Sequence, residues 1–391
     1  MQGKYYPLSV PSLKGNELKY VSDCIETEWV SSVGSYVSKF EEDMKKFTGA
    51  KNAVAVTNGT AALHLSLIAA GVEEDDEVFV PTITFIAPVN AIRYVGAHPI
   101  FIDCDDYLNI SPEAVIEFIN KNCVYEKNVL RNKSTGRKIS ALVPVHIFGN
   151  PVDIEKIMEI SEKYGLKVIE DATESLGSYY KIGKYAGRKT GTIGHFGCFS
   201  FNGNKIITTG GGGMAVCNDG ENSEKIRYLS TQAKDDALLY IHDNVGYNYR
   251  MTNLQAALGC AQLEKIEQYI KIKRENFDAY KKNLRNINGV NLIGEPEYAF
   301  SNLWFYSLLV DTFKIKFDKL KFIGRLKENK IESRPLWYLN HLQKPYLNSP
   351  KSEMKKSEFY YERIVNIPCS VNLTAGDVEH ISKIIIEALN G

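Results

Sequence analysis

The sequence lacks the cysteine pattern of a secreted or zinc-binding protein. Its seven cysteines are odd in number, widely scattered and include no C-x-x-C pair. This usage is typical of a reduced cytoplasm and supports neither a disulfide framework nor a zinc site. The seven histidines are equally dispersed, so we expect no metal site.

The sequence also lacks net charge and long apolar runs. Lys+Arg and Asp+Glu both number 47, which gives no overall basic footprint for nucleic acid. The longest nearly apolar stretch, 61–72, falls short of the ~20 residues that a membrane span needs, and the N-terminus has no apolar signal segment. We therefore expect a cytoplasmic protein whose partners include neither a membrane nor nucleic acid.

What the chain does contain is a regular alternation of apolar strands and helical patterns. Its 391 residues exceed one ordinary core, so two domains are the default. Strands that alternate with helices of about 10–15 residues predict a largely parallel sheet covered on both faces. The expected strands are 53–57, 78–81, 99–103, 139–147 and 166–170, and the expected helices are 38–50, 60–70, 84–95 and 154–164.

The pattern changes character in the last third of the chain. One long helical pattern covers 253–284, and short strands at 303–310 and helices at 318–329 and 375–389 follow it. We therefore predict a large domain at 1–260, which includes an N-terminal arm, and a smaller domain at 261–391. The polar and basic segment 125–138 is better explained as a solvated loop or hairpin than as a phosphate-binding patch.

The most informative residue is Lys205, which lies between apolar and hydroxyl-bearing residues and precedes four glycines at 210–213. A lysine amine is a useful nucleophile only where its surroundings favour the neutral form or hold it in a Schiff base. No carboxylate stands beside Lys205 in the sequence, which is typical of a lysine that binds pyridoxal phosphate (PLP). Taken alone, the segment is better explained as a glycine-rich turn with an exposed lysine.

Other segments offer groups that such a cofactor needs. Asp171 ends the strand 166–171, where a carboxylate can pair with a protonated pyridine nitrogen; a helix cap is the alternative, and Glu170 should point to the opposite face. The turn 58–61 opens a helix directly after a strand, which is a potential anion site. Ser200 could reach the same phosphate. Phe85 could lie against a heteroaromatic ring or pack in the core.

Seven short motifs, in order along nearly the whole chain, resemble the DegT/StrS family of PLP-dependent nucleotide-sugar aminotransferases. These are 27–32 (TEWVSS), 58–64 (NGTAALH), 81–85 (PTITF), 170–172 (EDA), 199–201 (FSF) with Lys205, 246–251 (GYNYRM) and 334–337 (RPLW). The resemblance implies the aspartate-aminotransferase fold, fold type I of the PLP-dependent transferases. In that α/β fold, a large domain with a mostly parallel sheet is joined to a smaller C-terminal α+β domain.

The resemblance also assigns roles to individual residues. The implied catalytic residue is Lys205, which forms the Schiff base and moves the proton. The implied cofactor-binding residues are Thr60, Ala61 and Ser200 at the phosphate, Phe85 against the ring, Asp171 at the ring nitrogen, Glu174 near the 3′-oxygen, and Asn248 from the partner subunit. The implied substrate-binding residues are Trp29, Arg250, Trp337 and His341.

Two positions of the motifs or of the implied site, 174 and 334, depart from the family pattern or admit another role. Glu174 stands where many members have Gln or His, so its protonation or orientation near the cofactor is open. Arg334 could bind a carboxylate or form a structural ion pair. The role of Asn248 implies a homodimer whose active sites are shared between subunits.

The implied reaction is ping-pong transfer of an amino group from L-glutamate to C4 of a nucleotide-linked 4-keto-6-deoxy sugar. The segments 200–209 and 231–236 look most like C4-aminating enzymes of diamino-sugar and legionaminic-acid pathways, which implies polysaccharide biosynthesis and a sugar N-acetylated at C2. Three alternatives stay open: amination at C3, a PLP-dependent sugar dehydratase, and a catalytically silent regulatory protein. Lys205 argues against the dehydratase branch, which carries His there. The sequence does not distinguish UDP from GDP.

Overall fold

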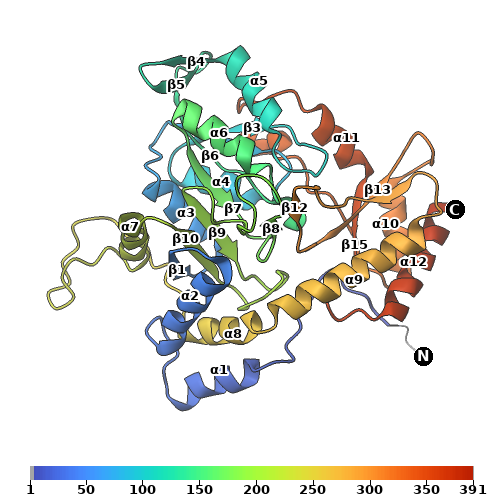
Figure 1. The fold of residues 1–391 in the computed structure, drawn as a ribbon, viewed down its shortest axis with the longest axis horizontal. Helices are drawn as coiled ribbons and strands as arrows, with labels where there is room; N and C mark the ends of the chain where they lie inside the picture. The colour runs from blue at the N-terminus through green and yellow to red at the C-terminus, as the bar shows by residue number, and fades with distance from the viewer. Residues whose placement is uncertain (1–3, 391) are drawn as a thin grey trace.

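The computed structural model describes residues 4–390 and is built around one large mixed sheet (Figure 1). Within these residues the sheet has nine strands, seven of which form a continuous path. Their order is β1 (Asn52–Val56), β10 (Gly213–Cys217), β9 (Phe196–Ser200), β7 (Lys167–Asp171), β6 (Lys138–Leu142), β2 (Glu77–Pro81) and β3 (His98–Ile102). Neighbouring strands from β9 to β3 are parallel, whereas β10 runs antiparallel to both β1 and β9.

Helices cover both faces of this sheet, as the strand residues require. In β1, Ala53 and Ala55 face a core cluster that includes Phe40 and Met44, while the alternate residues Val54 and Val56 face another cluster. The strands are therefore apolar on both sides, as parallel sheets usually are. The covering helices are α2 (Ser35–Thr48), α3 (Gly59–Ala69), α4 (Ile86–Tyr94), α5 (Pro112–Asn122), α6 (Ile154–Tyr164), α7 (Gly220–Ser230) and α8 (Asn253–Leu263).

A second core lies in the C-terminal part, at the right of Figure 1. The long helix α9 (Ile266–Leu284) leads to an antiparallel four-stranded sheet and packs against the last helix. Tyr6 from the N-terminal arm packs into the same core as Tyr280 and Tyr306. The elements are β11 (Val290–Leu292), β13 (Tyr306–Val310), β15 (Ile364–Ile367), β14 (Arg334–Pro335), α10 (Lys319–Glu328) and α12 (Ala375–Asn390).

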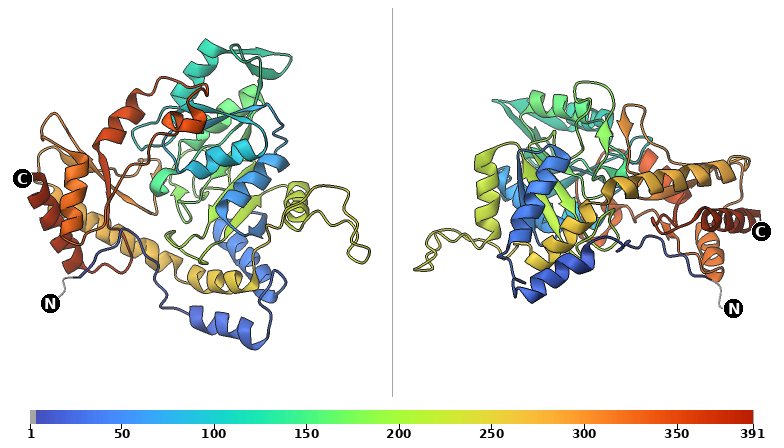
Figure 2. Two further views of the ribbon diagram at one scale, coloured as in Figure 1. Left: turned by 180° about the vertical axis from the view of Figure 1, so that it is seen from behind. Right: turned by 60° about the horizontal axis from the view of Figure 1, so that its bottom comes forward.

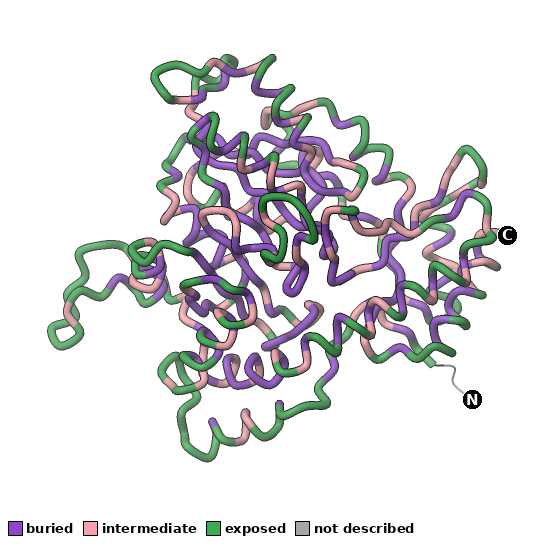
Figure 3. The backbone as a smooth tube through the Cα atoms, in the orientation of Figure 1, coloured by how far each residue is buried: buried purple, intermediate pink, exposed green. Residues whose placement is uncertain are grey.

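Smaller elements complete the chain between residues 4 and 390. Helix α1 lies along α8, and the two views in Figure 2 show it at the edge of the molecule. Figure 3 shows that the central strands are buried, whereas the segment that follows α7 projects outward and is mostly exposed. No helix among the described residues is both long and apolar enough to cross a membrane. These elements are α1 (Glu17–Glu26), β4 (Cys123–Glu126), β5 (Val129–Asn132), β8 (Tyr179–Tyr180), β12 (Ala299–Phe300), α11 (Lys355–Arg363) and the 3-10 turns Ile147–Gly149, Asn340–Leu342 and Lys344–Tyr346.

The structure confirms the predicted α/β class and most of the expected elements. The segment 125–138 contains the antiparallel hairpin of β4 and β5, as predicted. The prediction of one helix over 253–284 was wrong, because the chain forms α8 and α9 with a break at 264–265. The two helices pack against different partners: α8 against α1 and α2, and α9 against α12. The boundary at 260/261 falls inside α8 and stays a prediction.

Candidate active site

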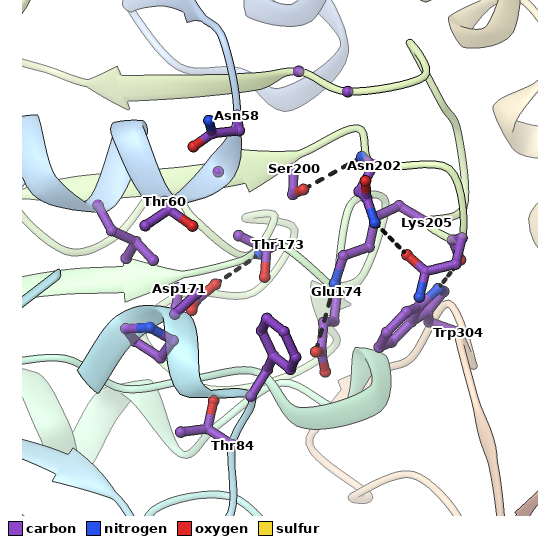
Figure 4. A pocket seen from close by; sticks show the side chains of 18 of the residues that line it. Asn58, Thr60, Thr84, Asp171, Thr173, Glu174, Ser200, Asn202, Lys205 and Trp304 are labelled. Atoms are coloured by element: carbon purple, nitrogen blue, oxygen red, sulfur yellow. Dashed lines mark hydrogen bonds and ion pairs between the residues drawn. The ribbon is translucent and has the colours of Figure 1, made fainter. Parts of the chain in front are cut away.

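A cavity of about 360 Å³ opens where several strands of the large sheet end (Figure 4). Its walls come from the segments that follow β1, β2, β7 and β9, together with residues 304–305 and 337 of the C-terminal part. Ligands of open α/β sheets bind beyond the carboxyl ends of the strands, so the cavity lies where the topology favours binding.

The start of helix α3 forms one end of this cavity. Asn58 caps the helix, since its Oδ1 accepts a hydrogen bond of 2.7 Å from the N–H of Ala61. Gly59 and Thr60 follow and line the cavity, and the first N–H groups of a helix have no carbonyl partner within it. A Cβ atom on Gly59 would lie 2.8 Å from the Cβ of Ser200, so glycine allows the strand end to approach. The result is an end that offers N–H and hydroxyl groups to an anion.

Asp171 and Glu170 end β7 on opposite faces of the sheet. Asp171 lines the cavity, is 2% exposed and accepts a hydrogen bond of 3.1 Å from the N–H of Thr173. Burial raises the pKa of Asp171, although the hydrogen bonds from Thr173 and the charge of Lys205 oppose the rise. Glu170 instead bonds His146 and the backbone of loop 191–194. The expected orientation of the two carboxylates is therefore what the structure shows.

Lys205 lies opposite the helix start, on the loop after β9. Its Nζ lies 3.6 Å from Oε1 of Glu174 and 4.0 Å from the centre of the Trp304 ring. The loop is fixed by a hydrogen bond from the Trp304 indole N–H to the carbonyl of Asn204, 2.8 Å long. Burial raises the pKa of Glu174 from 4.5 to about 7, while the charge of Lys205 and the N–H of Phe148 oppose the rise.

Phe85 supplies an uncovered aromatic face at the same cavity. It immediately precedes α4 and is 55% exposed. The segment before it is held from behind, because the Asn340 side chain donates to the carbonyls of Thr82 and Thr84 at 3.1 and 2.7 Å. His341 is buried beside Thr82, and burial lowers its pKa from 6.5 to about 4. His341 therefore lies behind the segment that precedes Phe85, where it is hydrogen-bonded to Thr82.

The comparisons with known proteins agree with this arrangement. Residues 11–386 match the DegT/DnrJ/EryC1/StrS aminotransferase family. The chain belongs to this family. The GDP-perosamine synthases of Escherichia coli O157:H7 and Vibrio cholerae are similar to it, with 39% and 38% identity over 98% of this chain and 98% and 99% of theirs. The crystal structure of the aminotransferase TlmJ from Streptoalloteichus hindustanus superposes with a TM-score of 0.88 at 25% identity, covering 99% of both chains.

The protein is thus a PLP-dependent nucleotide-sugar aminotransferase, and its cavity suits that cofactor. PLP is a flat molecule with an anionic phosphate, a basic ring nitrogen and an aldehyde. The cavity combines an anion-binding helix start, a buried carboxylate, an uncovered aromatic ring and an amine. Each chemical group of the cofactor therefore has a complementary group in the aminotransferase.

The aminotransferase gathers seven of the residues proposed from its sequence in this cavity. They are Thr60, Phe85, Asp171, Glu174, Ser200, Lys205 and Trp337. Ala61 lies just behind, where its N–H is taken by Asn58. His341 does not line the cavity and is buried beside Thr82.

Three proposed residues lie away from the cavity within this single chain. Trp29 and Arg250 line a second, wider cavity of about 660 Å³. Arg250 is paired there with Glu41, at 2.6 Å. Asn248 is exposed near the end of the projecting segment. Their roles at the active site stay predictions.

The structure adds residues that sequence reasoning did not single out. Trp304, Phe305, Thr173, Asn202 and Asn204 also line the cavity. Asn202 and Asn204 lie within three residues of Lys205, which was a usable signal. Trp304 had no such signal, because nearly one hundred residues separate it from the lysine.

Proposed function

We propose that this enzyme transfers an amino group from L-glutamate to C4 of a nucleotide-linked 4-keto-6-deoxy sugar. The observation that carries the C4 assignment is the similarity to two GDP-perosamine synthases over 98% of the chain. Perosamine is a 4-amino-4,6-dideoxy sugar, so its formation requires amination at C4. The presence of Lys205 in the cavity supports amine transfer.

The residues of the cavity have distinct proposed roles. When bound, PLP supplies an aldehyde that carries the amino group and a ring that withdraws electrons from carbon. Thr60 and Ser200 bind the phosphate, and Phe85 covers one face of the ring. Asp171 keeps the ring nitrogen protonated, because a buried carboxylate is a strong partner for a cation.

Lys205 moves the proton. Its Nζ accepts a proton from the carbon of the amino donor and delivers it to a second carbon, so one group acts as general base and then as general acid. The ketone of the sugar receives the amino group in the second half-reaction, in which the same proton movements run in reverse. Trp337, at the rim, is proposed to contact the nucleotide sugar.

The proposal includes a homodimer with shared active sites. Asn248 is exposed and Trp29 is 54% exposed in the single chain, so both are accessible to a second copy. In the proposed dimer Asn248 reaches the phosphate site of the partner. Trp29, Arg250 and His341 keep their proposed role in substrate binding, with Arg250 exchanging its bond to Glu41 for a substrate group.

The experiment is a panel of acceptor sugars with L-glutamate as donor, followed through release of 2-oxoglutarate. The panel contains 4-keto and 3-keto sugars on GDP and UDP, a 4-keto sugar N-acetylated at C2, and the free 4-keto sugar. The N-acetylated sugar is the substrate that the resemblance to legionaminic-acid enzymes implies. We expect a nucleotide-linked 4-keto sugar to give the highest kcat/KM, because remote binding energy positions the ketone.

Each outcome of the panel has a distinct meaning. Preference for a 3-keto sugar would refute the C4 assignment and leave the aminotransferase intact. Equal use of the free sugar would remove the role of the nucleotide. Loss of a hydroxyl from the sugar as water, without net amination, would indicate the dehydratase alternative.

A further inference from the structure

The amine of Lys205 lies between two groups that both favour a positive charge. Oε1 of Glu174 is 3.6 Å from Nζ, and the ring centre of Trp304 is 4.0 Å from it. The lysine side chain is 13% exposed and that of Glu174 is 3% exposed, so water screens this contact little. An indole is the best aromatic partner for an ammonium group.

The protein holds Trp304 rigidly in this position. Its indole N–H donates to the carbonyl of Asn204, and its backbone N–H donates to Oδ1 of Asn302 at 2.9 Å. Its carbonyl accepts a hydrogen bond of 2.9 Å from the buried Lys273 of helix α9. Trp304 is 2% exposed, so the ring has little room to move away from Lys205.

Glu174 is fixed by the same part of the chain. Its Oε2 accepts the N–H of Phe148 at 2.8 Å, which leaves Oε1 toward Lys205. Its carbonyl accepts a hydrogen bond of 2.9 Å from the side chain of Asn302, two residues before Trp304. The segment 302–304 therefore holds both the carboxylate and the ring beside the amine. Figure 4 shows Glu174, Trp304 and Lys205 together at the cavity.

We propose that Glu174 and Trp304 form a resting site for the ammonium group of Lys205, and that Trp304 is a positioning residue. The site holds Lys205 in the stages of the cycle in which its nitrogen is not bonded to the cofactor. Nζ takes one proton from a carbon, is held as ammonium between the carboxylate and the ring, and returns the proton to a second carbon, so no proton is gained or lost. This proposal rests on the proposed function only in taking Lys205 as the reacting amine.

The charges around the site allow a specific test. Of the residues that line the cavity, the ionisable ones are Lys205, Glu174 and Asp171. Asp171 stays in every variant below, so a change in the behaviour of Lys205 reports on Glu174 or Trp304. Burial raises the pKa of Glu174 to about 7, so its carboxylate is mostly charged above that pH.

The experiment measures how fast an amine-reactive acylating reagent modifies Lys205 in the full-length protein without cofactor. Peptide mass spectrometry separates Lys205 from the surface lysines. The modification rate at about pH 8 is divided by the plateau rate at high pH. Because only the neutral amine reacts, this ratio reports the neutral fraction of Lys205, and the division removes differences in how easily the reagent reaches it. The variants are Glu174→Gln, Trp304→Leu and Trp304→Phe, with Trp337→Leu as the control on the same cavity.

We expect Glu174→Gln to raise this ratio at least about tenfold, because it removes an opposite charge close to the ammonium. Trp304→Leu should raise it about fivefold through loss of the ring, while Trp304→Phe should stay within about twofold of the native protein. The Trp337→Leu control should be unchanged.

Other outcomes would overturn the proposal. If Glu174→Gln and Trp304→Leu both leave the ratio at the native value, the two groups do not hold the ammonium. If Trp304→Phe changes the ratio as much as Trp304→Leu, the indole acts through the Asn204 bond and not through its ring. Thermal unfolding of each variant identifies any that fails to fold. If a Trp304 variant fails, the ratio measured for Glu174→Gln still tests the proposal. No sugar or amino donor is present, so failure here leaves the proposed substrate untouched.

Discussion

Replacing Asp171 by Asn is expected to weaken PLP binding while preserving the fold. The carboxylate is buried at the end of β7 and faces the cavity. It accepts a hydrogen bond from the N–H of Thr173, and the amide oxygen of Asn can accept the same bond. Asn therefore fits the space but cannot stabilise a protonated ring nitrogen. Loss of one charge-assisted hydrogen bond costs about 1.5–3 kcal/mol, which corresponds to roughly 10- to 150-fold in the Kd for PLP.

The assay titrates the cofactor-free protein with PLP and follows absorbance, which gives Kd directly. The proton transfer by Lys205 should slow in the same variant, and the single-turnover rate with L-glutamate measures this. The matched control is Glu170→Gln on the opposite face of β7. Glu170 holds His146 and loop 191–194, so its loss should lower the melting temperature without a comparable loss of PLP affinity.

The pKa values of the two carboxylates shift in opposite directions: burial raises the pKa of Asp171, whereas the pKa of Glu170 is lowered. Burial alone would raise the pKa of Glu170, but hydrogen bonds from His146 and from the N–H groups of Gly194 and Gly191 lower it below 4.5. Its contribution to stability is therefore present above the unfolded pKa and is lost as pH falls through the folded pKa. The reasoning is refuted if Asp171→Asn binds PLP as tightly as the native protein while Glu170→Gln does not.

Three further predictions follow from the geometry. When inactive Lys205→Ala protein is mixed with an impaired Asn248→Leu protein under subunit exchange, part of the activity should return, because one site of each heterodimer then carries neither change. No recovery would place Asn248 in its own chain's site. Gly213→Ala should lower the free energy of unfolding by about 1–3 kcal/mol, because the new Cβ would overlap the backbone of residue 58, whereas Gly220→Ala, which meets no atom within 4 Å, should be tolerated. Without cofactor, raising the pH from 4.5 to about 7 should lower the free energy of unfolding of the native protein by on the order of 2–3 kcal/mol more than that of Glu174→Gln, because folded Glu174 binds its proton more tightly than the unfolded chain does. Equal pH profiles of the two proteins would contradict this.

The amino-acid sequence by itself determined the class of fold and the chemistry of the site. Apolar strands alternating with helices predict a largely parallel sheet, because parallel strands need helical crossovers and buried faces. The same periodicity put Asp171 at a strand end and Glu170 on the opposite face, since side chains alternate along a strand. Family motifs predicted that Lys205 is the reacting lysine and which residues bind PLP. These features are local, so short stretches of sequence carry them.

Only the tertiary structure decided which distant groups meet. The break between α8 and α9 depends on the separate partners against which the two helices pack, so the continuous helical pattern over 253–284 did not reveal it. Trp304 contacts the amine of Lys205 because β13 and α9 bring residues 302–304 to the loop after β9. The pKa of Glu174 follows from burial beside that amine. Long-range packing, burial and the electrostatic field are properties of the folded chain, and no short segment of its sequence specifies them.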